Sequence, residues 1–117
     1  MSNTFLSLLQ LEQSFQSEDF RLKTQQQIQK DFAFAHAEFP EDFCENSRTL
    51  YDLELLVQHE LAKVMEQSER HTLQLLYQID IPQDRFLELT TDPDFLPKMS
   101  NLLIRREAYK VYLRSKF

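Results

Sequence analysis

The C-terminal segment carries the side chains best suited to bind an anionic partner. Residues 98–117 hold six basic residues and one acidic residue, whereas residues 1–97 hold 7 Lys and Arg against 18 Asp and Glu. Residues four apart share one face of a helix, so these basic residues form two ladders about 90° apart. The candidates for contact with a partner or an anion are Arg105, Arg106, Lys110, Arg114 and Lys116.

Several partners fit this charge asymmetry, and so does an internal explanation. A basic helix with interleaved tyrosines can contact an acidic protein surface, anionic lipid or nucleic acid phosphates. The net charge of −6 makes nucleic acid unlikely, because the acidic remainder of the chain would repel phosphate. We expect instead that the basic last helix neutralises the acidic body within one fold, where cations near its C-terminus also favour the helix dipole.

Arg106 is the least ordinary of these residues, because a helical wheel places it at the centre of an apolar face. A buried guanidinium needs a partner, since an unpaired buried charge is very costly. We predict an ion pair with a glutamate or aspartate of the helices over 48–66 and 69–79, with Glu60 and Glu54 as candidate partners. In the alternatives, Arg106 reaches solvent at the helix end, or it faces a ligand pocket with Tyr77 or Tyr109.

Neither metal nor nucleophile chemistry is indicated. The chain has three histidines and one cysteine, and the motifs Glu-x-x-His and His-Glu-x-x-His do not occur. His59 and His71 are expected at the surface. Cys44 follows acidic residues that disfavour its thiolate, so we expect a small buried hydrophobe. No catalytic residue, cofactor or metal is predicted.

The absence of glycine restricts both motifs and folds. Glycine is the residue that most readily adopts a positive φ in tight hairpins, helix C-caps and phosphate-binding loops. Without it, glycine-dependent nucleotide motifs are excluded and β-hairpins are disfavoured. We therefore predict an all-α chain with few positive-φ positions, in which Pro, Asn, Asp and Ser make the turns.

Apolar spacing and capping residues predict a single-domain bundle over residues 1–117. It has four main helices, one short helix and the basic C-terminal helix at its centre. The predicted helical ranges are 4–14, 18–38, 48–66, 69–79, 83–89 and 95–116. One continuous bent helix over the first two ranges is an alternative.

The apolar phase of each helix predicts its buried face. The clearest stripe, on 48–66, contains Leu50, Leu53, Val57, Leu61 and Val64. On 69–79 the inward residues are predicted to be Leu73, Leu76 and Tyr77, and glutamines 25–27 are placed in solvent. The last helix has a second apolar face, which the first two helices or a second copy of the chain must cover. That face consists of Ile104, Ala108 and Val111.

The leading functional interpretation is a small non-enzymatic module for protein–protein interaction or regulation, with a homodimer through the helix over 95–116 or 48–66 as one form. One alternative is a ligand-binding or enzymatic bundle with Arg106 and a tyrosine at a cavity. The other is nucleic-acid binding through the basic C-terminal helix. No signal peptide or membrane span is indicated, and a single cysteine suits a reducing compartment, so we expect a cytoplasmic protein.

Overall fold

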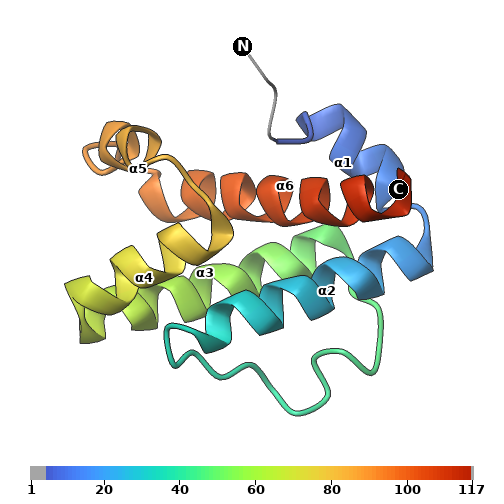
Figure 1. Cartoon of the computed structure of the whole chain (residues 1–117), viewed down its shortest axis with the longest axis horizontal. Helices are drawn as coiled ribbons and strands as arrows, with labels where there is room; N and C mark the ends of the chain where they lie inside the picture. Colours follow the sequence, from blue (N-terminus) through green and yellow to red (C-terminus); the bar gives the residue numbers. More distant parts are fainter. Residues whose placement is uncertain (1–4, 117) are drawn as a thin grey trace.

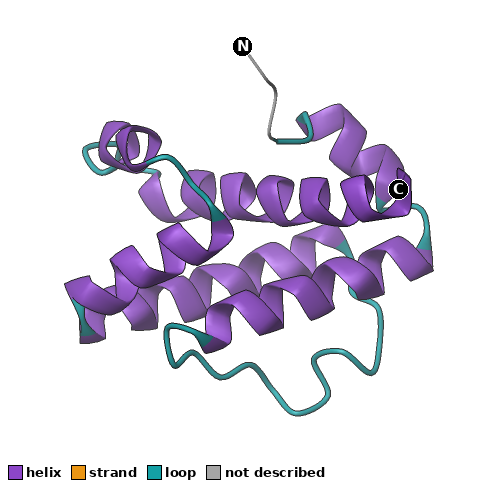
Figure 2. Ribbon diagram, viewed as in Figure 1, coloured by secondary structure: helices purple, strands orange, loops and turns teal. Residues whose placement is uncertain are grey.

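Six α-helices, with no strand among the described residues, build the fold (Figures 1 and 2). The computed structural model describes residues 5–116, with Lys116 described by its backbone alone. The helices are α1 (Leu8–Ser14), α2 (Glu18–Ala33), α3 (Leu50–Gln67), α4 (Glu69–Ile79), α5 (Gln83–Leu89) and α6 (Phe95–Lys116). The all-α prediction is confirmed, and the last three predicted ranges agree with α4, α5 and α6. Two helices, α1 and α5, are short, and α1 is separate from α2.

The basic helix α6 lies at the centre, as predicted, and contacts each of the other five helices. In Figure 1 it runs across α2 and α3, with α1 and α5 beyond its other side. Its second apolar face is buried: Ile104, Ala108 and Val111 are at most 2% exposed. The chain itself therefore covers this face, and a second copy is not needed for that purpose.

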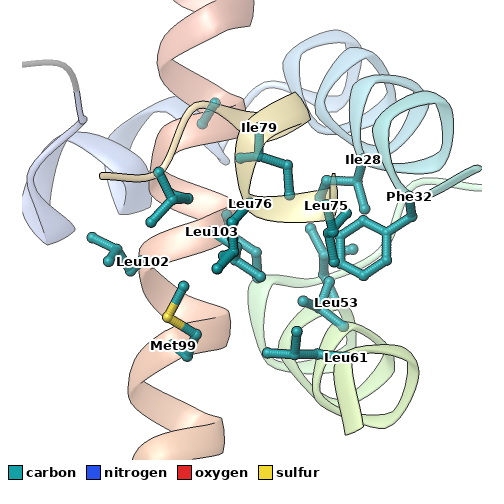
Figure 3. Close-up of a cluster of buried hydrophobic side chains, with 14 of the residues drawn as sticks. Ile28, Phe32, Leu53, Leu61, Leu75, Leu76, Ile79, Met99, Leu102 and Leu103 are labelled. Carbon is teal, nitrogen blue, oxygen red and sulfur yellow. The ribbon is translucent and has the colours of Figure 1, made fainter. Parts of the chain in front are cut away.

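The core forms where α2, α3, α4 and α6 meet (Figure 3). The predicted stripe of α3 is confirmed, because Leu53, Val57, Leu61 and Val64 are at most 1% exposed, with Leu50 partly buried at its start. Thr49 caps α3 by accepting a hydrogen bond from the backbone N–H of Asp52 at 3.1 Å. A threonine oxygen here satisfies one of the unpaired amides of the first turn.

The predicted phase of α4 is wrong. Leu73 is 43% and Tyr77 86% exposed, while Thr72, Leu75, Leu76 and Ile79 are buried. The buried residues follow the i, i+3, i+4, i+7 spacing, and Thr72 belongs to this buried face of α4 although its side chain is polar. That hydroxyl is satisfied locally, since it donates to the Ser68 carbonyl at 3.0 Å.

The first helix also differs from its prediction. It begins at Leu8 because Ser7 and Gln10 form a capping box, and the predicted residue 4 lies outside the described residues. Leu8 is exposed, whereas Leu11 is completely buried.

Helix α2 ends at Ala33 rather than at Pro40, through a Schellman motif built without glycine. His36 N donates to Ala33 O at 3.1 Å, and Ala37 N donates to Phe32 O at 3.2 Å. His36 takes the left-handed position, with φ 60°, which glycine usually occupies.

Helix α4 ends in the same way. Asp80, with φ 71°, donates its N–H to Tyr77 O at 3.2 Å, and Ile81 N donates to Leu76 O at 2.9 Å. Histidine and aspartate enter this region more readily than most residues. These two are the positive-φ residues of the described chain, in agreement with the expectation of few such positions.

Substitution on α3 tests the buried stripe. Val57→Asp places an unpaired carboxylate in the core and should lower the free energy of unfolding by at least about 3 kcal/mol. The control His59→Asp lies on the exposed face of the same helix and should cost under about 0.5 kcal/mol. Urea denaturation followed by circular dichroism measures both changes. Equal costs would contradict the observed phase of α3.

Candidate functional site

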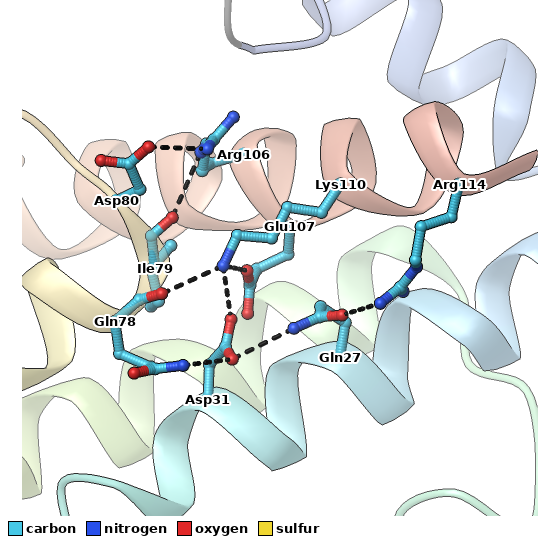
Figure 4. Close-up of polar contacts among 9 residues, drawn as sticks. All are labelled: Gln27, Asp31, Gln78, Ile79, Asp80, Arg106, Glu107, Lys110 and Arg114. Carbon is cyan, nitrogen blue, oxygen red and sulfur yellow. Dashed lines mark hydrogen bonds and ion pairs between the residues drawn. The ribbon is translucent and has the colours of Figure 1, made fainter. Parts of the chain in front are cut away.

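Polar side chains from α2, α4 and α6 meet inside the bundle (Figure 4). Lys110 lies at their centre: its Nζ is 2.8 Å from Asp31 Oδ2 and 3.2 Å from Glu107 Oε1. Gln27 Nε2 donates to the other Asp31 oxygen at 3.1 Å. The buried polar cluster is defined as Gln27, Asp31, Gln78, Glu107 and Lys110.

The two carboxyl groups of this cluster are almost inaccessible to solvent, with Asp31 1% and Glu107 0% exposed. Burial raises the pKa of Glu107 well above its ordinary value, and the nearby Asp31 raises it further. Burial also raises the pKa of Asp31, but hydrogen bonds with Glu107, Lys110 and Gln27 outweigh this effect and lower it. When the pair shares one proton, that proton therefore resides on Glu107, and Asp31 carries the charge opposite Lys110.

Two basic residues of α6 also cap the C-terminus of α4. Lys110 Nζ donates to Gln78 O at 3.1 Å, and Arg106 Nε donates to Ile79 O at 3.2 Å. The last carbonyls of a helix lack intrahelical partners and carry partial negative charge, so cations stabilise them. Arg106 and Lys110, four residues apart on α6, thus anchor the end of α4.

Arg106 forms an ion pair of the predicted kind, with an acidic residue at the end of α4, but that residue is Asp80 and not one of the two candidate glutamates. Its Nη2 lies 2.9 Å from Asp80 Oδ2, and its guanidinium lies over the Tyr109 ring at 5.7 Å. Glu60 instead pairs with Lys63 at 3.3 Å. The Asp80 side chain is 78% exposed, because the left-handed turn that ends α4 places it at the surface. The pair therefore lies at the edge of the core and not within it.

The other predicted basic residues have different surroundings. Arg105 Nε donates to Leu6 O at 2.6 Å, which ties the N-terminal segment to α6. Arg114 Nη1 donates to Gln27 Oε1 at 2.6 Å. The side chain of Lys116 lies outside the described residues. Contact of this set with an external partner stays a prediction.

Two of the three glutamines placed in solvent are buried, which corrects that prediction. Gln25 is 0% and Gln27 7% exposed. Gln25 Nε2 donates to Phe43 O at 2.6 Å and Asn46 O at 3.0 Å, and its Oε1 accepts from Arg48 N at 2.8 Å. One amide side chain thus satisfies three backbone groups of the long loop after α2, as buried polar groups require.

Asp31 and Glu107 are the site residues that sequence reasoning missed. Glu107 lies between Ile104 and Val111 at helical spacing, and so within the second apolar face of α6. An acidic residue in that position signals a buried, paired carboxyl. Asp31 directly precedes Phe32 of the core and carries no comparable signal.

The outer face of α4 exposes large apolar side chains. A groove of about 710 Å³ between α4 and the end of α2 is lined by Phe34, Leu73 and Tyr77, among others. A second groove, of about 310 Å³, is lined by Leu73, Tyr77 and Ile81. Phe34 is 55% exposed. Tyr77 therefore lines open grooves that Arg106 and Tyr109 do not line, whereas Arg106 and Tyr109 are in contact with each other.

The histidines and Cys44 form no obvious reactive site. Among the described residues, no three His, Cys, Asp or Glu side chains are grouped as metal ligands would be. Cys44 is half-buried, its Sγ lies 3.2 Å from Gln29 Oε1, and burial raises the pKa of its thiol despite the nearby Arg48. His71, expected at the surface, is half-buried against the His36 ring, with centroids 4.8 Å apart. None of the described helices has the length and apolar character to cross a membrane.

The ion pairs of Lys110 and Arg106 should differ in how much free energy of unfolding is lost when each is broken. Lys110→Met leaves the buried Asp31 carboxylate unpaired and should lower the free energy of unfolding by about 3–5 kcal/mol. Arg106→Met leaves the exposed Asp80 carboxylate solvated and removes the hydrogen bond to Ile79 O. We therefore expect the free energy of unfolding to fall by about 1–2 kcal/mol. Adding Asp31→Asn to the Lys110 variant should recover much of the loss, whereas adding Asp80→Asn to the Arg106 variant should recover none. Denaturant titrations would contradict this if both pairs behaved alike.

Glu107 should make stability depend on pH. Its folded-state pKa is raised, so above the ordinary pKa of a glutamate the folded chain holds a proton on Glu107 that the unfolded chain has lost. The free energy of unfolding of the wild type should therefore fall as pH rises from the ordinary glutamate pKa through the raised pKa of Glu107. Glu107→Gln removes this titration, and its stability should fall less. Glu66→Gln, at an exposed site, is the control and should follow the wild type. Parallel curves for all three proteins would show that Glu107 does not titrate abnormally.

Comparison with known proteins adds no family: no family model, no curated protein and no solved structure matches the chain. The function is therefore inferred from the geometry of the molecule.

Proposed function

We propose that the protein is a non-enzymatic protein-interaction module that acts as a homodimer through the outer face of α4. A single observation carries the proposal: one exposed stripe of this helix is complementary to itself. The α4 stripe consists of Arg70, Leu73 and Tyr77 on the helix and Asp80 in the left-handed turn directly after it, all exposed.

The spacing of the α4 stripe is 3, 4 and 3 residues, the repeat by which two helices pack along a seam. Suppose that two copies pack antiparallel, with a two-fold axis that crosses the outer face of α4 at the level of residue 75. Each residue then faces the residue of the partner subunit that lies equally far on the other side of position 75. Leu73 then lies opposite Tyr77 of the partner subunit, and Arg70 lies opposite Asp80 of the partner subunit. Each contact occurs twice, once on either side of the axis.

The chemistry of each contact favours this pairing. Tyr77 is 86% exposed, and a large exposed tyrosine beside a leucine is typical of interface anchors. The grooves of about 710 and 310 Å³ on either side of the stripe can receive the side chains of a second helix. Arg70 and Asp80 have opposite charges, so the antiparallel arrangement attracts where a parallel one would place like charges together. Asp80 is paired with Arg106 of its own chain, but its side chain is 78% exposed and can accept a second cation.

The buried polar cluster supports the stripe from behind. Lys110 and Arg106 hold the last two carbonyls of α4, so this face is presented on a rigid element, which lowers the entropy lost on binding. In these contacts the side chains of Arg106 and Lys110 bind groups of the same chain, and Arg105 likewise binds the Leu6 carbonyl. No observation therefore favours a cavity at Arg106 or nucleic-acid binding over the homodimer.

Sedimentation velocity over a wide concentration range tests the dimer. The wild type should associate, and Tyr77→Ser should raise the dissociation constant at least tenfold, because it removes about 1.4 kcal/mol or more at a central anchor. Arg70→Glu should weaken the dimer by facing Asp80 of the partner subunit with a like charge. Adding Asp80→Asn should partly restore it.

Leu87→Ser on α5 is the matched control, since Leu87 is also exposed, at 57%, but lies outside the stripe. It should associate like the wild type. Circular dichroism should show unchanged helix content in every variant, because all the sites are at the surface. A monomeric wild type, or equal effects of Tyr77→Ser and Leu87→Ser, would refute the proposed interface.

A further inference from the structure

We infer that a second, basic groove between α2 and α6 is a binding site for a small phosphate-bearing ligand. The groove has a volume of about 380 Å³, and its lining residues include Lys23, Gln26, Gln27, Lys30, Val111 and Arg114. Three cations line it and no acidic residue does, although the chain as a whole carries a net charge of −6. It shares no residue with the α4 stripe, so the inference is independent of the proposed dimer.

The positive charges of this groove are poorly compensated. Lys30 makes no hydrogen bond or ion pair with any of the described residues. Lys23 lies 3.0 Å from Asp19, but the two side chains are 54% and 75% exposed, and such surface pairs are weak. Arg114 uses Nη1 on the Gln27 carbonyl oxygen, and a neutral amide does not balance its charge. An anion would supply the missing partner for all three.

The groove is also organised from within. Gln27 is only 7% exposed, and its Nε2 donates to Asp31 while its Oε1 accepts from Arg114 at 2.6 Å. Asp31, a carboxylate paired with Lys110, can only accept from this amide, so the orientation of Gln27 is determined. The buried polar cluster thereby holds the guanidinium of Arg114 in place, and Val111, 2% exposed, is the apolar part of the lining.

Size and spacing indicate the ligand class. A volume of about 380 Å³ is at the small end of ligand pockets. Lys23 and Lys30 are two turns apart on α2, about 10 Å along the axis, and Arg114 approaches from α6. The guanidinium fork suits phosphate oxygens, and the lysines add point charges. This set fits a compact diphosphate group, whereas a long polyanion would meet the acidic remainder of the surface.

A second groove shows why these cations are distinctive. Arg85, Lys98 and Arg105 line it together with Glu88. Lys98 is paired with Asp92 at 2.6 Å, Arg105 donates to Leu6 O, and Arg85 lies over the Phe5 ring. Glu88 lines this groove and Lys98 is paired with Asp92, so it carries less uncompensated positive charge than the α2–α6 groove.

A ¹H–¹⁵N NMR titration with pyrophosphate tests the site. The side-chain amides of Gln26 and Gln27 and the Val111 amide should shift and saturate, with inorganic phosphate binding more weakly. Lys30→Gln should weaken pyrophosphate binding about fivefold and Arg114→Gln about tenfold, since Arg114 contributes the paired donors. Lys98→Gln is the control, because it removes the same charge from an exposed position outside the groove.

The remaining cross-peaks of each variant verify that the fold is intact, so a loss of binding is not a loss of structure. Non-saturating shifts with both probes would overturn the site. Equal weakening by Lys98→Gln would show that net charge alone attracts the anion, which also overturns it. Tighter binding of a single-stranded oligonucleotide than of pyrophosphate would assign the groove to nucleic acid instead. None of these outcomes depends on the oligomeric state.

Discussion

Lys110 joins three helices through one ammonium group, and much of the molecule depends on that contact. Its Nζ reaches Asp31 on α2, Glu107 on α6 and the Gln78 carbonyl at the end of α4. Such a charge is tolerated inside a bundle only when its partners are close and complete. Two carboxyls sharing a proton meet this condition, because together with the ammonium they leave little net charge. The cluster thus fixes the packing of α4 against α2 and α6 more specifically than apolar contacts alone would.

The chain closes its helices without glycine by placing histidine and aspartate at left-handed positions. At His36 and Asp80 the backbone bonds of the Schellman motif offset the cost of a positive φ. Asp80 has a further consequence, because its carboxylate emerges at the surface beside Arg106. The residue that ends α4 therefore also supplies a charge at the end of the exposed stripe. Helix termination and the proposed interface are linked through one side chain.

The basic C-terminal helix divides its cations between the interior and the surface. Arg105, Arg106 and Lys110 contact carbonyls or carboxylates of the same chain, which accounts for much of the charge asymmetry as internal neutralisation. Arg114, one turn further on, faces the groove with the lysines of α2. Gln27 connects the two sets, since it bonds both Asp31 and Arg114. A ligand at the proposed groove site would therefore be one hydrogen-bonded residue, Gln27, away from the buried polar cluster.

The sequence alone determined the features that depend on local periodicity and capping. The stripe of α3 and the bounds of α4 to α6 follow from residues a few positions apart, so no tertiary information is needed. Only the tertiary structure decided the partners: Asp80 for Arg106, Asp31 for Lys110, and backbone groups of a distant loop for Gln25. These pairs are separated by 18 to 79 residues, and no local pattern selects one carboxylate among many. The phase of α4 belongs to the same class, because whether Thr72 or Tyr77 faces inward depends on the helices that α4 meets.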